Sequence, residues 1–277
     1  RKGNVRAFEV VSRIMYGEAN KEELKIRKAE LKIKQEQHAA EMEQYENRKD
    51  VFGQREYHGI PALSIAPSFA SVLFDIDEHK HTEYVFEGGR GSTKSSFISL
   101  AIIDLMMRHD NLNALVLRQV GNTIRGSVYN QIIWAIDQLG LNNEFHCTAN
   151  PTEITRLSTG QKIFFRGAYD PLKLKSIKAS IGYIGIVWLE ELDQFYGEES
   201  VRKIQQSAMR GGALAWIFKS FNPPKSALNW ANKYVKIPKD NAFIHASNYL
   251  SVPKKWLGAS WLEEAEYLKE VNPIAYE

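Results

Sequence analysis

The chain has 277 residues, and because 36 Lys and Arg nearly balance 33 Asp and Glu, its formal net charge is only +3. Net charge alone therefore does not indicate a nucleic-acid partner, and any basic surface must be local. The single cysteine, Cys147, excludes an intrachain disulfide framework and a cysteine-rich zinc site, and it is compatible with a reducing cytoplasm. No apolar run approaches the ~20 residues of a membrane-spanning helix, so we expect no membrane association.

Residues 1–50 differ in composition from the rest of the chain. From Lys21 to Asp50 nearly every residue is a strong helix former, opposite charges alternate, and Gly and Pro are absent. Leu24 and Leu31 begin a seven-residue spacing of larger side chains. We predict a charged helical arm or linker, which is either a short coiled-coil seam or a solvated amphipathic helix.

Residues 51–277 are expected to form one globular domain, in which short apolar runs alternate with longer helical patterns. The runs interpreted as strands are Tyr84–Phe86, Ala114–Leu117, Ile184–Leu189, Ala215–Phe218 and Phe243–His245. The segments interpreted as helices are Lys94–Arg108, Thr123–Leu139, Glu198–Met209, Ala227–Lys233 and Trp256–Glu270. Continuous apolar strands separated by helices indicate an α/β fold with a mainly parallel sheet flanked by helices. Two further runs, Glu153–Leu157 and Lys162–Arg166, predict an inserted antiparallel hairpin.

The stretch EGGRGSTKSS follows the first predicted strand and precedes the first predicted helix. From Gly88 to Ser95 it fits the phosphate-binding pattern G-x-x-x-x-G-K-S/T except at Thr93, where the pattern has glycine. We interpret it as a P-loop in which Lys94 reaches the β- and γ-phosphates of ATP and Ser95 holds Mg²⁺. The predicted nucleotide-binding residues are Gly88, Gly89, Arg90, Gly91, Ser92, Thr93, Lys94 and Ser95.

Two residues make this loop unusual. We expect Thr93 to keep a negative φ, because β-branched residues resist positive values of that angle. Arg90 adds a guanidinium group inside the loop, which can reach the γ-phosphate or pair with an acidic neighbour. A glycine-rich turn with a solvent-facing lysine is the alternative interpretation of the loop taken alone.

Acidic and amide side chains follow two later strands. Glu190 and Glu191 come directly after the apolar run Ile184–Leu189, and we assign Glu190 to the metal and Glu191 to general-base catalysis. Asn222 follows the run Ala215–Phe218, at a strand end where an amide can sense the γ-phosphate. A helix N-terminus that favours acidic residues, and an Asn-Pro turn, are the structural alternatives.

Five segments in this order, GGRGSTKS, LRQVGNTIRGSVYNQI, IFFRGAYDPLKLKSIKAS, IVWLEELDQF and SFNPP, resemble the large terminase subunits of tailed bacteriophages, notably the PBSX-type group. The resemblance covers roughly residues 60–277. It implies the ATPase motor domain of a P-loop (ASCE/RecA-like) enzyme that pushes double-stranded DNA into an empty capsid. It also implies a deviant Walker A containing Arg90, a Walker B acid at Glu190, where relatives more often have aspartate, and a catalytic glutamate at Glu191. Ser220-Phe221-Asn222 resembles the family's coupling motif.

The resemblance also implies partners and a location. These are double-stranded DNA, the portal protein, the small terminase subunit and a homo-oligomeric ring, expected to be a pentamer on the procapsid portal in the host cytoplasm, although an isolated domain can be a monomer. Part of Arg166–Ser180, with its lysines, is expected to face DNA or a neighbouring subunit. Members of the family normally carry a C-terminal nuclease domain, and because the sequence stops at Glu277 we expect this chain to lack nuclease activity.

An arginine from the same or a neighbouring subunit often completes such a site by neutralising transition-state charge. Four arginines are considered, with Arg125 favoured as a catalytic residue because it follows a polar loop at the start of a helix; the others are Arg118, Arg166 and Arg210. On position alone, residues 67–74 are expected to form the wall that contacts adenine.

Two alternative functions stay open. A helicase- or recombinase-like ATPase acting on single strands is the alternative enzyme, and a scaffold with a decayed nucleotide site is the non-enzymatic alternative. The former predicts stacking aromatics in a basic groove, whereas Trp134, Trp188, Trp216 and Trp230 lie in apolar patterns typical of a core.

Overall fold

The computed structural model describes residues 57–169, 174, 177–209 and 211–271, and everything below refers to them. The chain divides into two compact units, Arg1–Arg55 and Glu56–Glu277, so all described residues belong to the second unit. The predicted helical arm at residues 1–50 lies outside the described residues, as do Arg210, Lys173 and Lys175.

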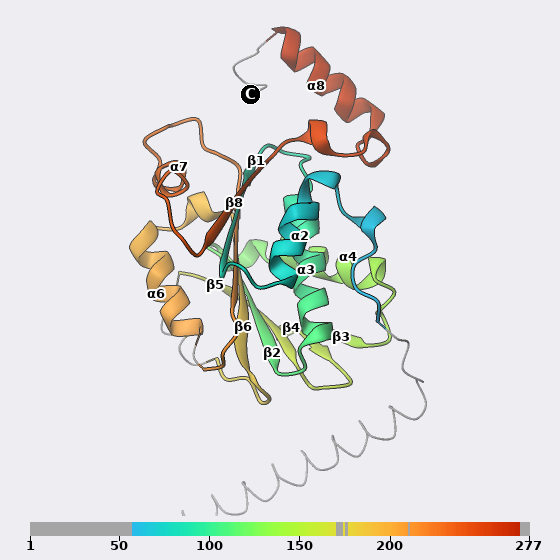
Figure 1. The fold of residues 1–277 in the computed structure, drawn as a ribbon, viewed down its shortest axis with the longest axis vertical. Coiled ribbons are helices and arrows are strands. Elements are labelled where there is room, and N and C mark those ends of the chain that lie inside the picture. Colours follow the sequence, from blue (N-terminus) through green and yellow to red (C-terminus); the bar gives the residue numbers. More distant parts are fainter. Residues whose placement is uncertain (1–56, 170–173, 175–176, 210, 272–277) are drawn as a thin grey trace, which may run out of the picture. The chain divides into compact units, whose positions relative to one another are not determined.

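A single eight-stranded sheet forms the centre of this unit, in the order β3-β4-β5-β2-β6-β7-β1-β8 (Figure 1). Its strands are β1 (Glu83–Gly88), β2 (Leu112–Arg118), β3 (Phe145–Ala149), β4 (Thr152–Arg156), β5 (Lys162–Gly167), β6 (Tyr183–Glu190), β7 (Trp216–Phe221) and β8 (Ala242–Ser247). Neighbours from β5 to β8 pair in parallel, whereas β3–β4 and β4–β5 are antiparallel. The predicted mainly parallel α/β fold is confirmed.

The predicted hairpin is present as β4 and β5, but it is not a separate insertion. β5 pairs in parallel with β2, so the hairpin extends the main sheet instead of standing outside it. The sheet then ends at β3, a strand that the sequence analysis missed. β3 gave a weak signal because three of its five residues, His146, Cys147 and Ala149, are exposed at the sheet edge.

The helices are α2 (Ala70–Asp77), α3 (Lys94–Arg108), α4 (Asn130–Gln138), α6 (Glu198–Ala208), α7 (Trp230–Tyr234) and α8 (Ala259–Val271). The predicted bounds of α3 are those observed. The helix expected over Thr123–Leu139 is divided instead, because a π-helical turn, Arg125–Tyr129, precedes α4. Within this turn the hydroxyl of Ser127 donates to the carbonyl oxygen of Thr123, so a side chain competes with the regular backbone ladder. The sequence analysis also missed α2.

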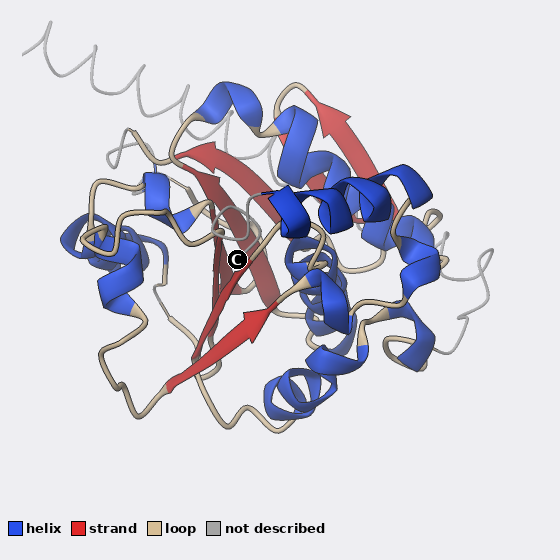
Figure 2. Ribbon diagram, turned by 90° about the horizontal axis from the view of Figure 1, so that it is seen from above, coloured by secondary structure: helices blue, strands red, loops and turns tan. Residues whose placement is uncertain are grey.

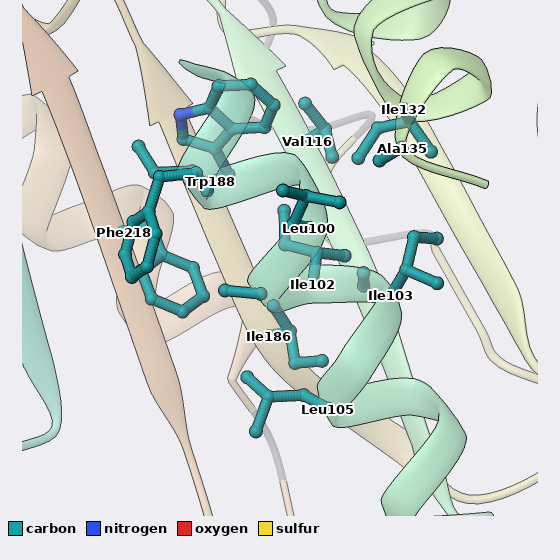
Figure 3. Close-up of a cluster of buried hydrophobic side chains, with 14 of the residues drawn as sticks. Leu100, Ile102, Ile103, Leu105, Val116, Ile132, Ala135, Ile186, Trp188 and Phe218 are labelled. Atoms are coloured by element: carbon teal, nitrogen blue, oxygen red, sulfur yellow. The ribbon is translucent and has the colours of Figure 1, made fainter. Parts of the chain in front are cut away.

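Helices cover both faces of the sheet (Figures 1 and 2). On one face α3 lies against the strands with α2 and α4, and its Leu105 lies near Ile186 of β6 while its Ile103 points toward α4, all within one buried cluster (Figure 3). On the other face α6 and α7 pack over a second cluster that includes Val187 and Ile204. α3 is buried along almost its whole length because both the sheet and α4 contact it. A helix held this firmly fixes the position of the loop that precedes it.

None of the described helices is both long and apolar enough to cross a bilayer.

Candidate nucleotide-binding site

The glycine-rich loop connects β1 to α3, as expected for a phosphate-binding loop. Gly88 approaches β8 so closely that a Cβ atom there would overlap the carbonyl oxygen of Ser247. Gly91 has a φ of +75°, in the left-handed region that glycine adopts without steric cost. Both glycines are therefore required by the backbone path itself.

Thr93 does not keep the negative φ expected from its β-branched side chain. It adopts φ 62° and ψ 18°, which is the left-handed region, immediately before α3 begins at Lys94. The loop geometry thus demands at this position what glycine supplies in the usual pattern, and threonine adopts it at a steric cost. The Thr93 hydroxyl oxygen is also buried without a hydrogen-bond partner among the described residues.

Lys94 is folded into the loop and is 7% exposed. Its ammonium group donates to the carbonyl oxygens of Gly88 (2.7 Å) and Gly89 (3.0 Å), to the hydroxyl of Ser92 (2.9 Å) and to Oδ1 of Asn222 (3.1 Å). Burial lowers the pKa of Lys94 to about 8, although the Glu190 carboxylate opposes the shift. The lysine is thus held by neutral acceptors at the position where phosphate oxygens would compete for it.

Glu190 ends β6 and lies between the loop and β7. Ser95 donates a hydrogen bond to its Oε1 (2.9 Å), and Ser220 donates to its Oε2. Ser220 itself accepts a hydrogen bond from the buried indole of Trp188 at 2.9 Å. Burial raises the pKa of Glu190, while the two hydroxyls and the Arg118 and Lys94 charges oppose that rise.

Glu191 follows with φ and ψ both 57°, a second non-glycine residue in the left-handed region. Strained backbone of this kind persists where the surrounding structure holds it, commonly at functional sites. The Glu191 carboxylate forms an ion pair with Arg118, which ends β2. Arg118 also donates to the hydroxyl of Ser127 in the π-helical turn at 2.9 Å. Glu191 is therefore linked through one arginine to the turn that carries Arg125.

The strand order brings these groups together. β7 lies between β1 and β6, so Asn222, just beyond β7, stands between the loop lysine and the acidic pair. Together they surround a cavity of about 580 Å³. Its lining comprises Gly89, Arg90, Gly91, Ser92, Thr93, Lys94, Ser95, Ser96, Glu190, Glu191, Asp193, Gln194, Ser220, Phe221, Asn222, Trp256 and Leu257.

Most of the predicted site residues line this cavity, but Gly88, Arg125 and the predicted adenine wall do not. Arg125 is exposed on the π-helical turn and is absent from the cavity lining of its own chain. Residues 67–74 do not line the cavity either. Phe69 from that segment is fully buried and stacks on Phe97 of α3 with ring centroids 4.6 Å apart. Phe69 therefore belongs to the core, and a contact of this segment with adenine stays a prediction.

Arg166 and the tryptophans considered in the sequence analysis lie in different surroundings. Arg166 donates to Glu153 at 2.8 Å on β4, so a partner already neutralises it. Trp188 and Trp216 are core residues as expected, whereas Trp134 is 36% exposed on α4. The sequence analysis missed the cavity wall formed by Trp256 and Leu257, because these two residues are about 160 positions away from the phosphate loop.

A glycine-rich strand–loop–helix with a buried lysine, next to two carboxylates at the end of a parallel strand, defines the P-loop nucleotide-binding class of α/β proteins. Within that class, residues 80–277 match the Terminase_3 family, described as phage terminase large subunit. The chain belongs to this family.

Two curated relatives have similar sequences. The terminase large subunit of Bacillus phage SPP1 is 38% identical over 217 residues, which cover 76% of this chain and 50% of the relative. The PBSX phage terminase large subunit of Bacillus subtilis (strain 168) is 26% identical over 230 residues, covering 76% of this chain and 51% of the relative. The chain therefore spans about half the length of the curated relatives it matches.

Solved structures agree at the level of the fold. The large terminase of a thermophilic bacteriophage superposes with a TM-score of 0.58 at 12% identity, covering 76% of this chain and 52% of that one. The same protein in complex with ADP gives a TM-score of 0.57 at 12% identity, covering 76% of this chain and 51% of that one. At this identity the likeness extends to the fold and not to individual residues.

Proposed function

We propose that this chain is an ATP-hydrolysing motor domain that drives translocation of double-stranded DNA into the procapsid. The observation that carries the proposal is the convergence of Lys94, Glu190, Glu191 and Asn222 on one cavity in a chain of the terminase large-subunit family. ATP as the substrate is further supported by the large terminase of the thermophilic bacteriophage, whose structure has been determined with ADP and with ATP-γ-S.

Phosphate binding is assigned to the loop Gly88–Ser95 and the N-terminus of α3, where backbone N–H groups converge. Lys94 would exchange its carbonyl and amide acceptors for the β- and γ-phosphate oxygens. The exchange is favourable because a charged ammonium group gains more from an anion than from neutral oxygens. Arg90 is exposed at the mouth of the cavity, from which its guanidinium can reach the γ-phosphate.

The residues present fit a Mg²⁺ ion at Ser95 and Glu190. The Ser95 hydroxyl lies 2.9 Å from Glu190 Oε1, so two hard oxygen donors stand together beside the phosphate loop. Mg²⁺ takes few protein ligands and completes its shell with water and phosphate oxygens. This agrees with the described residues, in which no group of three or more His, Cys, Asp or Glu could hold a metal. A bound Mg²⁺ would neutralise charge on the phosphates during transfer.

Water activation is assigned to Glu191. Its carboxylate borders the cavity and, once separated from Arg118, can accept a proton from water that attacks the γ-phosphorus. Asn222 contacts Lys94 directly, so loss of the γ-phosphate after hydrolysis changes the partners of an amide at the end of β7. The Ser220-Phe221-Asn222 segment thereby links the state of the nucleotide to the movement of a strand end.

Arg125 is proposed to act on a neighbouring subunit, because it is exposed and has no hydrogen-bond or ion-pair partner among the described residues. A homo-oligomeric ring, expected to be a pentamer, would supply that neighbour. Further partners of the proposed motor are the portal protein, the small terminase subunit and DNA. DNA contacts should be made to phosphates, so that every base pair is gripped alike. The motor would work at the procapsid portal in the host cytoplasm.

The experiment that tests the proposal is steady-state ATP hydrolysis by wild type and Glu191→Gln, with and without duplex DNA. We expect the amide, which cannot accept a proton, to lower kcat by at least about 100-fold, in the range of general-base effects. Equal rates in the two proteins would refute the role of Glu191. Absence of turnover in wild type, even with DNA and the other motor components present, would refute the proposed function.

A matched control separates the neighbour's arginine from the chain's own chemistry. Arg125→Ala and Arg166→Ala are each mixed with the Glu191→Gln subunit. We expect Arg125→Ala assayed alone to lose the stimulated rate and its mixture with Glu191→Gln to regain part of it, because the Glu191→Gln neighbour supplies the missing arginine. Arg166→Ala, whose arginine is paired with Glu153, should retain the rate even when assayed alone. Unchanged rates with Arg125→Ala would remove that residue from the mechanism.

A further inference from the structure

The cavity over the phosphate loop is lined by two chemically different groups of residues. The loop, the acidic pair and Asn222 suit phosphates and a cation. Trp256 and Leu257, from the segment that follows β8, add an aromatic and an aliphatic side chain to the same lining and form its apolar wall. A nucleotide is polar at its phosphates and aromatic at its base, so the cavity and the ligand have matching polarity. Its volume of about 580 Å³ lies within the ~300–1,000 Å³ of sites that bury small ligands.

The Trp256 wall is anchored to the domain on the side that faces away from the cavity. Val252 is 5% exposed and belongs to the main core cluster, and Leu257 packs against the same cluster. The backbone N–H of Trp256 donates to the carbonyl oxygen of Pro253 at 2.8 Å, which closes a short 3₁₀ turn (Lys254–Trp256). The Ser251 hydroxyl donates to the Ser68 hydroxyl at 3.2 Å, which ties this segment to the short 3₁₀ turn before α2 as well. The indole of Trp256 nevertheless remains 38% exposed.

The first turn of α8 braces the wall against the phosphate loop. A Cβ atom on Gly91 would lie 2.8 Å from Cζ2 of Trp261, so the indole rests directly on the loop backbone. Trp261 in turn meets Tyr249 edge to face, with ring centroids 4.9 Å apart. The wall and the loop are therefore two sides of one enclosure.

We propose that Trp256 is the stacking platform for the nucleobase of a bound nucleoside triphosphate, with Leu257 beside it. The proposal rests on the proposed function, since it assigns the base end of the same substrate. Aromatic stacking tolerates every base, because each base has a π-face. The indole N–H is the only polar group of the two side chains, and it lies in the plane of a ring that stacks on the base, so this wall adds affinity without reading the edge of the base. ATP and GTP should gain equally from it.

The test is calorimetric binding of ATP-γ-S, GTP-γ-S and inorganic triphosphate to wild type, Trp256→Ala and Trp256→Phe. We expect Trp256→Ala to weaken both nucleotides by about tenfold and to leave triphosphate binding unchanged. Trp256→Phe retains a ring and should recover most of the affinity. Trp134→Ala, which removes another partly exposed indole outside the cavity, is the matched control and should bind as wild type does.

Three outcomes would overturn the proposal. Unchanged nucleotide affinity in Trp256→Ala, with wild type binding both nucleotides and triphosphate, refutes the base platform and leaves the hydrolysis proposal intact. An equal loss for nucleotides and triphosphate means that Trp256 supports the phosphate loop and not a base. Failure of wild type to bind any of the three ligands refutes the proposed function together with the platform.

Discussion

Thr93 offers a direct test of how the deviant phosphate loop is held. Replacing it by glycine restores the usual pattern and removes the steric cost of a left-handed residue, which is about 1–2 kcal/mol. It also removes a buried hydroxyl without a partner among the described residues, a further cost of about 1–3 kcal/mol. Glycine opposes these gains by about 0.4–1 kcal/mol, because the unfolded chain becomes more flexible. We expect Thr93→Gly to raise the free energy of unfolding by about 1–5 kcal/mol.

The assay is thermal and urea unfolding without nucleotide. For a domain of this size a gain of 1 kcal/mol raises Tm by about 2–4 °C. Thr93→Ala keeps the left-handed backbone but loses the hydroxyl and the γ-methyl group, so it should be stabilised by about 1 kcal/mol, less than the glycine variant. Thr93→Ser keeps both costs and should unfold near wild type. A glycine variant no more stable than the alanine variant would show that the loop stores no backbone strain at φ 62°.

Two further predictions concern the charged groups of the site. Because burial lowers the pKa of Lys94 to about 8, the lysine loses its charge above that pH. The calorimetric affinity for ATP-γ-S should therefore fall by up to about tenfold from pH 8 to pH 9 in wild type and stay level in Lys94→Arg. A level affinity profile in wild type would contradict the lowered pKa. Arg118→Ala frees Glu191 from a partly exposed ion pair worth about 1 kcal/mol, so basal ATP turnover should rise about fivefold. Ser127→Ala removes the second bond of Arg118 and the bond to Thr123 but keeps the Glu191 ion pair, so it should leave turnover unchanged; a fall in turnover of Arg118→Ala would mean that Arg118 assists the chemistry directly.

Much of the fold was readable because its signals are local. Continuous apolar runs identify parallel strands buried on both faces, and α3 was bounded correctly because its start is set by the phosphate loop. α2 and β3 were missed, since a short helix and an exposed edge strand carry little periodicity. The π-helical turn before α4 was also missed, because it depends on how the Ser127 hydroxyl is used once the chain is folded.

The sequence by itself singled out the residues that we propose supply the chemistry: the loop lysine, its neighbouring serine, the paired glutamates and the asparagine after β7. They could be assigned because each stands at the end of an apolar run, and in a parallel sheet such ends meet at one edge. The tertiary structure decided the partners of these groups. The pairing of Arg118 with Glu191 depends on β2 lying beside β6, and Trp256 reaches the cavity only because the chain returns over the loop after β8. Strand order and chain return are set by non-local packing, which no short stretch of sequence encodes.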